Sequence, residues 1–427
     1  MGEEVVNLYV HFPFCRRKCT YCALHSRAGS TPEERAAYVA RLAAALQSRR
    51  TTQLPNHRTT ALPNYRTIYF GGGSPALCDL RPLFEALAPY IDNTTTALPT
   101  HPPTALPNHR TTALPNYEFT VELHPLDATH ETLKMLKDGG VNRISMGVQS
   151  LDDDVLRHMG RIYTFAEAER AFMLVKEYFD NAGIDLIVGY PSTGDSPHPT
   201  GDSPQNEKTL SPRWARLAKW GLRHCSVYSL ILEEKSILFK QLHKRPSQQN
   251  WVDSPNENAA ESPLILPSDD IVLNKIAIIS RFLKEIGLER YEISNYAVPG
   301  YECQHNLATW RGEDYLGLGD GAHGRLGLLR TKNYWGQSPS NGGQSPNVET
   351  VSAEKDEIER RIFALRTRDG LSIANHPEWE SILEKFVSDG LLVKFTGDSP
   401  RTDGDSPRYR LTERGTEVCD TILAELV

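Results

Sequence analysis

Short apolar segments alternate with amphipathic segments along the first half of the chain. Runs rich in β-branched and aromatic residues predict strands, and the segments between them carry apolar residues at helical spacing. A strand followed by a helix, repeated six times, is typical of a parallel sheet with crossover helices. The predicted strands are 5–11, 67–70, 118–122, 143–148, 183–189 and 225–232, and the predicted helices are 32–47, 79–90, 129–138, 152–158, 165–182 and 212–220.

Six such units are fewer than the eight of a closed barrel, so we predict an α/β fold, an incomplete (β/α)6 TIM-like barrel that is open on one side. The carboxyl ends of parallel strands meet at one edge of a sheet, where binding sites are built. Polar and glycine residues stand at or just after the predicted strand ends, namely 71–74, Glu122 and Gln149. This pattern predicts one site at that edge.

Beyond residue 350 the pattern changes to helix, helix, hairpin and helix. The predicted helices are 354–367, 379–388 and 413–426, with a wing-like hairpin between the last two. We interpret this part as a small winged-helix-like α+β domain, and we favour a lid or docking role over DNA contact because no basic stripe accompanies it. The predicted domains are a barrel over 1–232, a connecting region over 233–350 and the C-terminal domain over 351–427.

Six proline-rich segments interrupt the alternation. They hold 19 of the 28 prolines, and two of them repeat a near-octapeptide unit that first runs from Thr51 to Arg58. A unit with one leucine cannot bury a core, and lengthening a surface loop costs little entropy. We interpret all six as inserted surface loops, with a linker or docking tract as the alternative. The segments are 48–66, 93–117, 193–212, 246–267, 336–347 and 396–407.

Composition and charge argue against two classes of protein, nucleic-acid binders and membrane-spanning proteins. The 427 residues carry a net charge of −7 and no basic cluster, which argues against a nucleic-acid binder. No apolar run reaches the roughly 20 residues of a membrane span. The first residues match neither a signal peptide nor a myristoylation site, so a cytoplasmic protein is expected.

Three of the seven cysteines lie within eight residues, in Cys15-Arg-Arg-Lys-Cys19-Thr-Tyr-Cys22, directly after the first predicted strand. Three thiolates on one loop can hold three corners of a metal site. A [4Fe–4S] cluster normally takes four cysteines, so three would leave one iron open to an exchangeable ligand. A zinc site with His25 as the fourth ligand is the alternative, and chance clustering is the third interpretation.

At this point the sequence resembles the radical S-adenosylmethionine (SAM) enzymes. Their signature is Cys-x3-Cys-x-aromatic-Cys after the first barrel strand, and the glycine-rich stretch Gly71-Gly-Gly-Ser-Pro75 matches theirs after the second strand. The resemblance implies that Cys15, Cys19 and Cys22 hold a [4Fe–4S] cluster whose open iron binds SAM. An electron from the reduced cluster would then split SAM, so the cofactor would carry the difficult chemistry.

Further motifs resemble the oxygen-independent coproporphyrinogen oxidase group. They include Tyr9-Val-His-Phe-Pro-Phe-Cys15, Arg143-Ile-Ser-Met-Gly-Val-Gln-Ser150 and Ile184-Asp-Leu-Ile-Val-Gly-Tyr-Pro191. Each residue taken alone has an ordinary structural explanation, whereas the set in register indicates SAM binding. The SAM contacts that the resemblance implies are Tyr9, Tyr21, Gly72, Gly73, Ser74, Glu122, Gln149, Arg161 and Asp185.

Two departures from the true oxidase favour the heme chaperone branch of this group. Leu24 stands where the oxidase would have a fourth cysteine, and the cysteine loop begins at residue 15 rather than after a longer N-terminal segment. That branch has a His-Asn-x-x-Tyr-Trp motif, which here reads His305-Asn306-Leu-Ala-Thr309-Trp310. The resemblance implies His305, Asn306 and Trp310 as heme contacts, and Thr309 replaces the tyrosine.

The resemblance therefore implies a heme chaperone that delivers heme to acceptor hemoproteins such as membrane respiratory enzymes, with a flavodoxin- or ferredoxin-type electron donor. An oxygen-independent coproporphyrinogen III oxidase, which decarboxylates its substrate in porphyrin biosynthesis, is the enzyme alternative. Whether SAM is cleaved during heme transfer and whether the chain forms a homodimer stay open.

Overall fold

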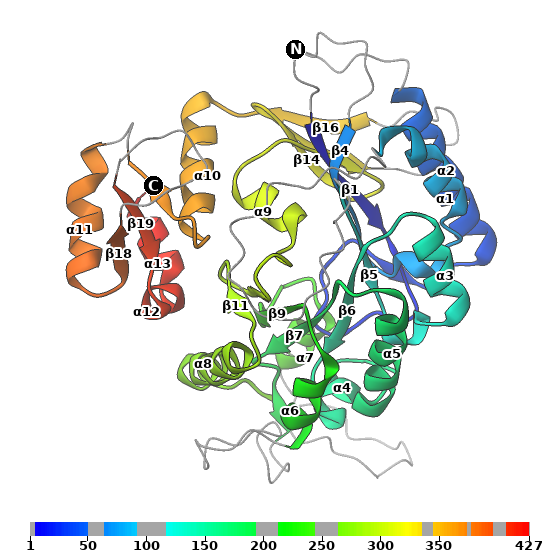
Figure 1. Ribbon diagram of the computed structural model, residues 1–427, viewed down its shortest axis with the longest axis horizontal. Helices are drawn as coiled ribbons and strands as arrows, with labels where there is room; N and C mark the ends of the chain where they lie inside the picture. Colours follow the sequence, from blue (N-terminus) through cyan, green and yellow to red (C-terminus); the bar gives the residue numbers. More distant parts are fainter. Residues whose placement is uncertain are drawn as a thin grey trace, which may run out of the picture.

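A 12-stranded mixed sheet forms the centre of the protein (Figure 1). The computed structural model describes residues 5–49, 64–91, 117–193, 212–243, 264–334, 345–373, 377–395 and 407–426. Six parallel strands occupy the middle of the sheet, and each pairs with the next one along the chain, which confirms the six predicted β/α units. These strands are β1 (Val5–Phe12), β4 (Asn64–Gly72), β5 (Glu118–Leu123), β6 (Arg143–Gln149), β7 (Ala182–Val188) and β9 (His224–Ser229).

Helices cover the outer face of these strands, as Figure 1 shows for α1, α2, α3 and α5. Alternate residues of each strand point to this face, and on β1 they are Leu8, Val10 and Phe12, all fully buried. The helices after successive strands are α1 (Pro32–Arg49), α2 (Arg81–Leu87), α3 (His130–Asp138), α4 (Asp153–His158), α5 (Phe165–Tyr178) and α6 (Pro212–Leu217). The apolar core therefore lies between the sheet and its helical layer.

The inner face of the same strands is polar. On β1 the residues that alternate with the apolar ones are Asn7, Tyr9 and His11, and on β4 they include Thr67 and Tyr69. Parallel strands buried on both faces usually carry apolar residues on both. A polar inner face therefore indicates that the inside of this open barrel holds a site rather than a packed core.

Residues from the predicted connecting region extend the sheet at both ends. β11 (Glu289–Arg290) and β12 (Asn295–Ala297) continue it beyond β9, and β13 (Tyr315–Leu318) pairs in parallel with β1. The sheet ends with β14 (His323–Leu326), β15 (Leu329–Tyr334) and β16 (Ser345–Thr350). This region also contains α7 (Ile237–Leu242), α8 (Asp269–Glu285) and α9 (Gln304–Trp310), and α9 contacts β4. The predicted boundaries at 232 and 350 stay a prediction.

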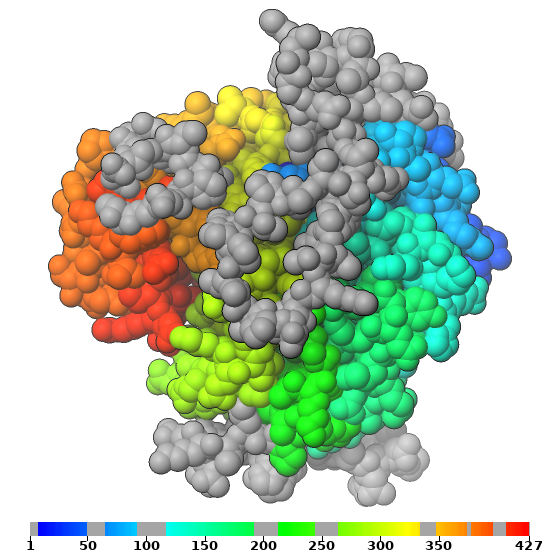
Figure 2. All heavy atoms as spheres, in the orientation of Figure 1, coloured from blue at the N-terminus to red at the C-terminus, as the bar shows by residue number. Residues whose placement is uncertain are grey.

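The C-terminal part, orange to red in Figures 1 and 2, lies on one side of the molecule and has an apolar core of its own. A three-stranded antiparallel sheet in the order β17-β19-β18 packs with the helices around it. The winged-helix-like assignment stays a prediction. The elements are α10 (Ala353–Leu365), β17 (Leu371–Ser372), α11 (Glu380–Ser388), β18 (Leu392–Phe395), β19 (Arg408–Leu411), α12 (Glu413–Glu417) and α13 (Cys419–Ala424).

Three predicted boundaries are wrong. The helix predicted over 165–182 ends at Tyr178, because the backbone of Phe179 is extended and leads into β7. The helix predicted over 413–426 breaks at Val418, and Gly415 in its first half packs directly against the backbone of Leu391. The strand predicted over 225–232 runs from His224 to Ser229.

Edges of five proline-rich segments are also structured rather than loops, and for the segment 193–212 they are Thr193 in β8 (Ser192–Thr193) and Pro212 in α6. Asn64–Arg66 belong to β4, where Tyr65 is buried against Tyr90, Leu264–Ile265 form the short strand β10 and Ser345–Asn347 belong to β16. A further edge residue, Tyr117, is buried and donates to the Gly140 carbonyl. A repeat that ends in tyrosine thus supplies core residues. Most of the remaining residues of the six segments lie outside the described residues. Among the helices that the structure describes, none is long and apolar enough to cross a membrane.

Candidate functional site

The cysteine loop begins where β1 ends and is fixed from both sides. Cys15 lies in the short strand β2 (Phe14–Cys15), which pairs with β3 (Arg27–Ala28) where the loop closes. Lys18 Nζ donates to the Leu24 carbonyl at 2.7 Å and to Ser26 Oγ at 2.8 Å. The Thr20 amide donates to the Met159 carbonyl at 3.0 Å. These contacts hold the loop over the carboxyl edge of the sheet.

The three thiols on this loop are half-buried. Burial raises the pKa of Cys15, and the neighbouring Cys22 and Cys19 raise it further, because nearby thiolates repel one another. Lys18 Nζ lies 3.9 Å from Cys22 Sγ, so a cation accompanies the sulfurs. The three thiols are thus soft donors carried by one short loop.

The zinc alternative requires several ligands to meet at one point. Within the described ranges, no three His, Cys, Asp or Glu side chains converge as ligands of a single metal ion. His25, the fourth ligand of the zinc alternative, lies instead with Nε2 2.9 Å from Asp320 Oδ2. A [4Fe–4S] cluster makes a different demand, because each cysteine binds its own iron and the sulfurs need not meet at one point.

The glycine turn at the end of β4 lies directly against the start of the cysteine loop. The Gly73 and Ser74 amides donate to the Phe12 and Phe14 carbonyls at 2.7 and 2.6 Å. Gly72 has φ +105°, and a Cβ there would lie 2.4 Å from the His11 ring. Only glycine meets both demands, which explains the residue type at this position.

Two carboxylates follow on the neighbouring strands. Glu122 on β5 accepts from the Gly72 amide at 2.9 Å and from the Tyr69 hydroxyl at 3.0 Å. Asp185 on β7 accepts from Ser145 Oγ at 3.1 Å. Burial, with the Asp185 charge as the second cause, raises the pKa of Glu122 to about 7, and burial also raises that of Asp185. The edge therefore places two buried carboxyl groups behind the glycine turn, and their burial disfavours the charged forms.

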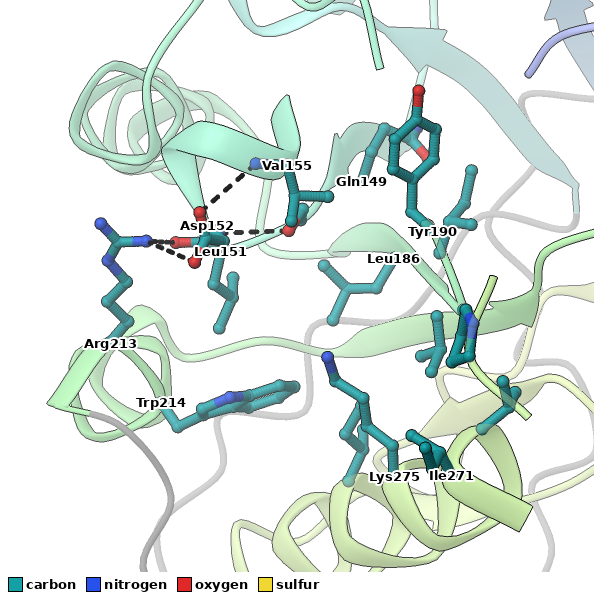
Figure 3. A pocket seen from close by; sticks show the side chains of 17 residues that line it. Gln149, Leu151, Asp152, Val155, Leu186, Tyr190, Arg213, Trp214, Ile271 and Lys275 are labelled. Carbon is teal, nitrogen blue, oxygen red and sulfur yellow. Dashed lines mark hydrogen bonds and ion pairs between the residues drawn. The ribbon is translucent and has the colours of Figure 1, made fainter. Parts of the chain in front are cut away.

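Arg161 and Gln149 complete the edge at β6. Arg161 Nη2 donates to the Tyr21 hydroxyl at 2.6 Å, which connects the cysteine loop to the segment after α4. Gln149 has φ +69°, and it is the one residue other than glycine with a positive φ among the described residues. It lines a small pocket of about 60 Å³ whose walls include Leu186, Tyr190, Trp214 and Lys275 (Figure 3).

Tyr9 lies farther into the barrel than the other predicted SAM contacts. Its hydroxyl lies 2.9 Å from His11 Nδ1, while His11 Nε2 lies 2.7 Å from the His25 carbonyl. A carbonyl can only accept, so Nε2 carries the proton and Tyr9 donates to Nδ1. The ring of Tyr9 faces the rings of Tyr69 and His305, whose centroids are 6.1 and 6.3 Å away.

A cavity of about 820 Å³ joins the cysteine loop to the predicted heme motif. His305, Asn306 and Thr309 of α9 line it. Thr309, which replaces the tyrosine of the motif, therefore faces the same space as the histidine. Trp310 does not line it, but packs on the Phe363 and Arg366 side chains of the C-terminal part. The lining also includes Tyr9, Leu24, His25, Tyr69, Lys235, Tyr315, His323 and Lys332.

Several residues around this cavity were not predicted from the sequence. Tyr315, His323 and Lys332 come from the strands that follow the motif, where no element was predicted. Thr67 and Asn7 lie behind His305 on the inner face of the barrel. The signal that indicates these two is the period-two alternation of polar and apolar residues within β1 and β4.

Comparison with known proteins identifies the class. The Radical SAM superfamily matches residues 9–199. The solved structure of coproporphyrinogen III oxidase (HemN) from Escherichia coli shares the fold, with a TM-score of 0.70 and 18% identity, and the match covers 99% of this chain and 90% of that one. Residues 9–199 thus form a Radical SAM domain.

Curated relatives define the family within that class. The heme chaperone HemW of Escherichia coli (strain K12) is 30% identical over 324 residues, which are 75% of this chain and 70% of that protein. The heme chaperone HemW of Lactococcus lactis subsp. lactis is 27% identical over 439 residues, which are 100% of this chain and 98% of that protein. The chain belongs to the HemW family.

Proposed function

We propose that this chain is a heme chaperone, which binds heme in the 820 Å³ cavity and delivers it to acceptor hemoproteins such as respiratory enzymes. One observation carries the proposal: His305 lies on the wall of a large cavity that also reaches the cysteine loop. The relatives are named heme chaperones, which points to the same cargo.

The cavity suits a flat, largely apolar ligand with anionic edges. The Tyr9, Tyr69 and Tyr315 rings surround His305, with ring centroids 5.1 to 6.5 Å from its own. The cations Lys235 and Lys332 also line the cavity. Aromatic faces stack on a porphyrin, ammonium groups pair with its propionates, and an imidazole nitrogen binds its iron. Asn306 lies beside His305 as a further contact.

The adjoining edge suits a [4Fe–4S] cluster and SAM. Cys15, Cys19 and Cys22 would hold the cluster, which in its reduced form supplies the electron for SAM cleavage from a flavodoxin- or ferredoxin-type donor. The open iron of that cluster would bind the amino acid end of SAM, beside the turn of Gly72 and Gly73 that packs against the start of the cysteine loop. The other residues proposed to contact SAM are Tyr9, Tyr21, Ser74, Glu122, Gln149, Arg161 and Asp185.

Heme titration of the anaerobically reconstituted protein tests the proposal. We expect stoichiometric heme binding with a Soret band, and we expect His305→Ala to weaken the affinity at least tenfold because the iron loses its nitrogen ligand. His130→Ala on the exposed surface of α3 is the matched control and should bind as the wild type does. Failure of the wild type to bind heme, or unchanged binding by His305→Ala, contradicts the assignment.

A turnover assay distinguishes the oxidase alternative from the chaperone function. With SAM, reductant and coproporphyrinogen III, we expect no protoporphyrinogen. Formation of that product at a catalytic rate would make the chain an oxidase instead. Incubation of the heme-loaded protein with an apo-hemoprotein then tests delivery, and transfer of the Soret absorbance to the acceptor is the expected result.

A further inference from the structure

A chain of buried hydrogen bonds lies behind the imidazole of His305. His305 Nδ1 lies 2.8 Å from Thr67 Oγ1, Thr67 Oγ1 lies 2.9 Å from Asn7 Oδ1, and Asn7 Nδ2 lies 3.0 Å from the Asp314 carbonyl oxygen. All three side chains are less than a tenth exposed. Each link is therefore shielded from water, and a reversed or missing hydrogen bond here is costly.

The Asp314 end of this series of hydrogen bonds determines which atom donates in each of them. The Asp314 carbonyl can only accept, so Asn7 must present its amide nitrogen to it and its carbonyl oxygen to Thr67. Asn7 Oδ1 also can only accept, so the single hydroxyl proton of Thr67 points to Asn7. Thr67 Oγ1 then offers only a lone pair to the histidine.

This direction of the hydrogen bonds determines the tautomer of His305. Since Thr67 accepts, Nδ1 of the ring carries the proton, and a neutral imidazole has only one N–H. Nε2 is left with a lone pair. A histidine binds a metal as the neutral imidazole, so this lone pair is the one available to iron. Which nitrogen of a histidine can bind a metal is set by the hydrogen bond that the other nitrogen makes.

The ring is also held in position by the rest of the fold. The His305 and Gln304 amides donate to the Glu118 carboxylate at 3.2 and 3.0 Å, which fixes the start of α9 against β5. The Tyr69 ring lies beside the imidazole, with 5.1 Å between the ring centroids. Backbone, ring and tautomer are thus fixed without any ligand.

We propose that Thr67 and Asn7 are positioning residues that keep His305 in its Nδ1–H form and so present the Nε2 lone pair to the iron of heme. This inference rests on the proposed function, because it gives His305 the role of axial ligand. The Nδ1–H to Thr67 hydrogen bond also increases the basicity of the ligand nitrogen. Partners of this kind commonly change metal affinity by about 10- to 100-fold when they are replaced.

The test compares Thr67→Val, which keeps the shape and removes the hydroxyl, with the matched control Thr67→Ser, which retains it. We expect Thr67→Val to weaken heme binding about tenfold and to lower the iron–histidine stretching frequency of the ferrous complex in resonance Raman spectra. Thr67→Ser should leave both within the range of the wild type. A general loss of packing would not move the stretching frequency in this selective way.

A second measurement needs neither heme nor a substitution at Thr67 or Asn7. The ¹⁵N shifts of histidine-labelled protein, with the His305 signals identified by their loss in His305→Gln, report which ring nitrogen carries the proton. We expect a protonated Nδ1 and an unprotonated Nε2. A protonated Nε2 overturns the inference, even where Thr67→Val fails to fold.

The outcomes separate this inference from the function on which it rests. If the wild type binds no heme, the proposed function fails. If the wild type binds heme and His305→Ala does not, while Thr67→Val matches the wild type in affinity and stretching frequency, the chaperone function stands and the positioning role is wrong.

Discussion

At the scale of single residues, the inner face of the barrel is a set of polar groups that each have a defined partner. Glu122 accepts two hydrogen bonds, and Asp185 lies near enough to raise its pKa. Burying two carboxylates together disfavours their charged forms. A cationic ligand bound beside them would restore the charged state, so this edge is suited to a positively charged partner such as SAM.

The raised pKa of Glu122 predicts a pH-dependent stability. The folded state holds the Glu122 proton up to about pH 7, whereas the unfolded chain releases it near its ordinary value of 4.5. The contribution of this group to stability is therefore complete below pH 4.5 and is lost as the pH rises through 7. Without ligands, the free energy of unfolding should fall between pH 5 and pH 8 in both proteins. We expect this fall to be about 2 kcal/mol smaller in Glu122→Gln than in the wild type.

Urea unfolding at the two pH values checks this prediction. Glu177→Gln, which changes an exposed carboxylate on α5, serves as the control and should follow the wild type. Equal pH dependence in Glu122→Gln and the wild type would show that Glu122 keeps an ordinary pKa in the folded protein.

At the scale of elements, a carboxylate on β5 attaches the start of α9 to the sheet. Glu118 on β5 accepts from the amides of Gln304 and His305, and its Oε2 lies 4.0 Å from Arg143 Nε. Arg143 is almost fully buried, so it depends on this negative partner. The pairing connects the position of the heme motif to the middle of the parallel sheet.

Removing the charge of Glu118 should loosen α9. Glu118→Gln keeps the size of the side chain but removes the carboxylate that lies within ion-pair range of Arg143, and we expect a loss of about 3 kcal/mol in the free energy of unfolding. Hydrogen exchange should accelerate at the amides of α9 more than at those of β5. The exposed Glu85→Gln on α2 is the comparison, and equal stability of the two variants would refute the role assigned to Glu118.

The elements also show how far the sequence could carry the prediction. The six parallel strands follow from alternation and length, and the cysteine loop and the glycine turn follow from their motifs. The partners of His305 do not, because Thr67, Glu118 and Asn7 are 187 to 298 positions away in the chain and meet it only when β1, β4 and β5 pair. No local pattern indicates that Tyr315 or Lys332 reaches the cavity, since the strands after the motif are short and irregular.

At the scale of the whole molecule, a group of ion pairs joins the C-terminal part to the sheet. Asp356 on α10 accepts from Arg325 of β14 at 2.5 Å, from Arg330 of β15 at 2.6 Å and from Arg360 at 2.8 Å. Arg325 is 3% exposed. Because Trp310 at the end of α9 also packs on Phe363 of α10, this interface lies directly beside the heme motif.

Asp356→Asn should therefore weaken the attachment of the C-terminal part. One carboxylate pairs with three arginines here, and its loss leaves the buried Arg325 with the longer contact to Glu359 at 3.4 Å. We expect a loss of about 3 kcal/mol in the free energy of unfolding, the size found when one partner of a buried pair is removed.

Limited proteolysis should cut the variant near residues 345–353 faster than the wild type, while heme affinity falls less than in His305→Ala because the cavity itself keeps its lining. Glu354→Gln, which changes an exposed carboxylate on the same helix, should be cut at the wild-type rate. Equal rates for all three proteins would mean that other contacts, such as those of Trp310, are enough to hold the C-terminal part in place.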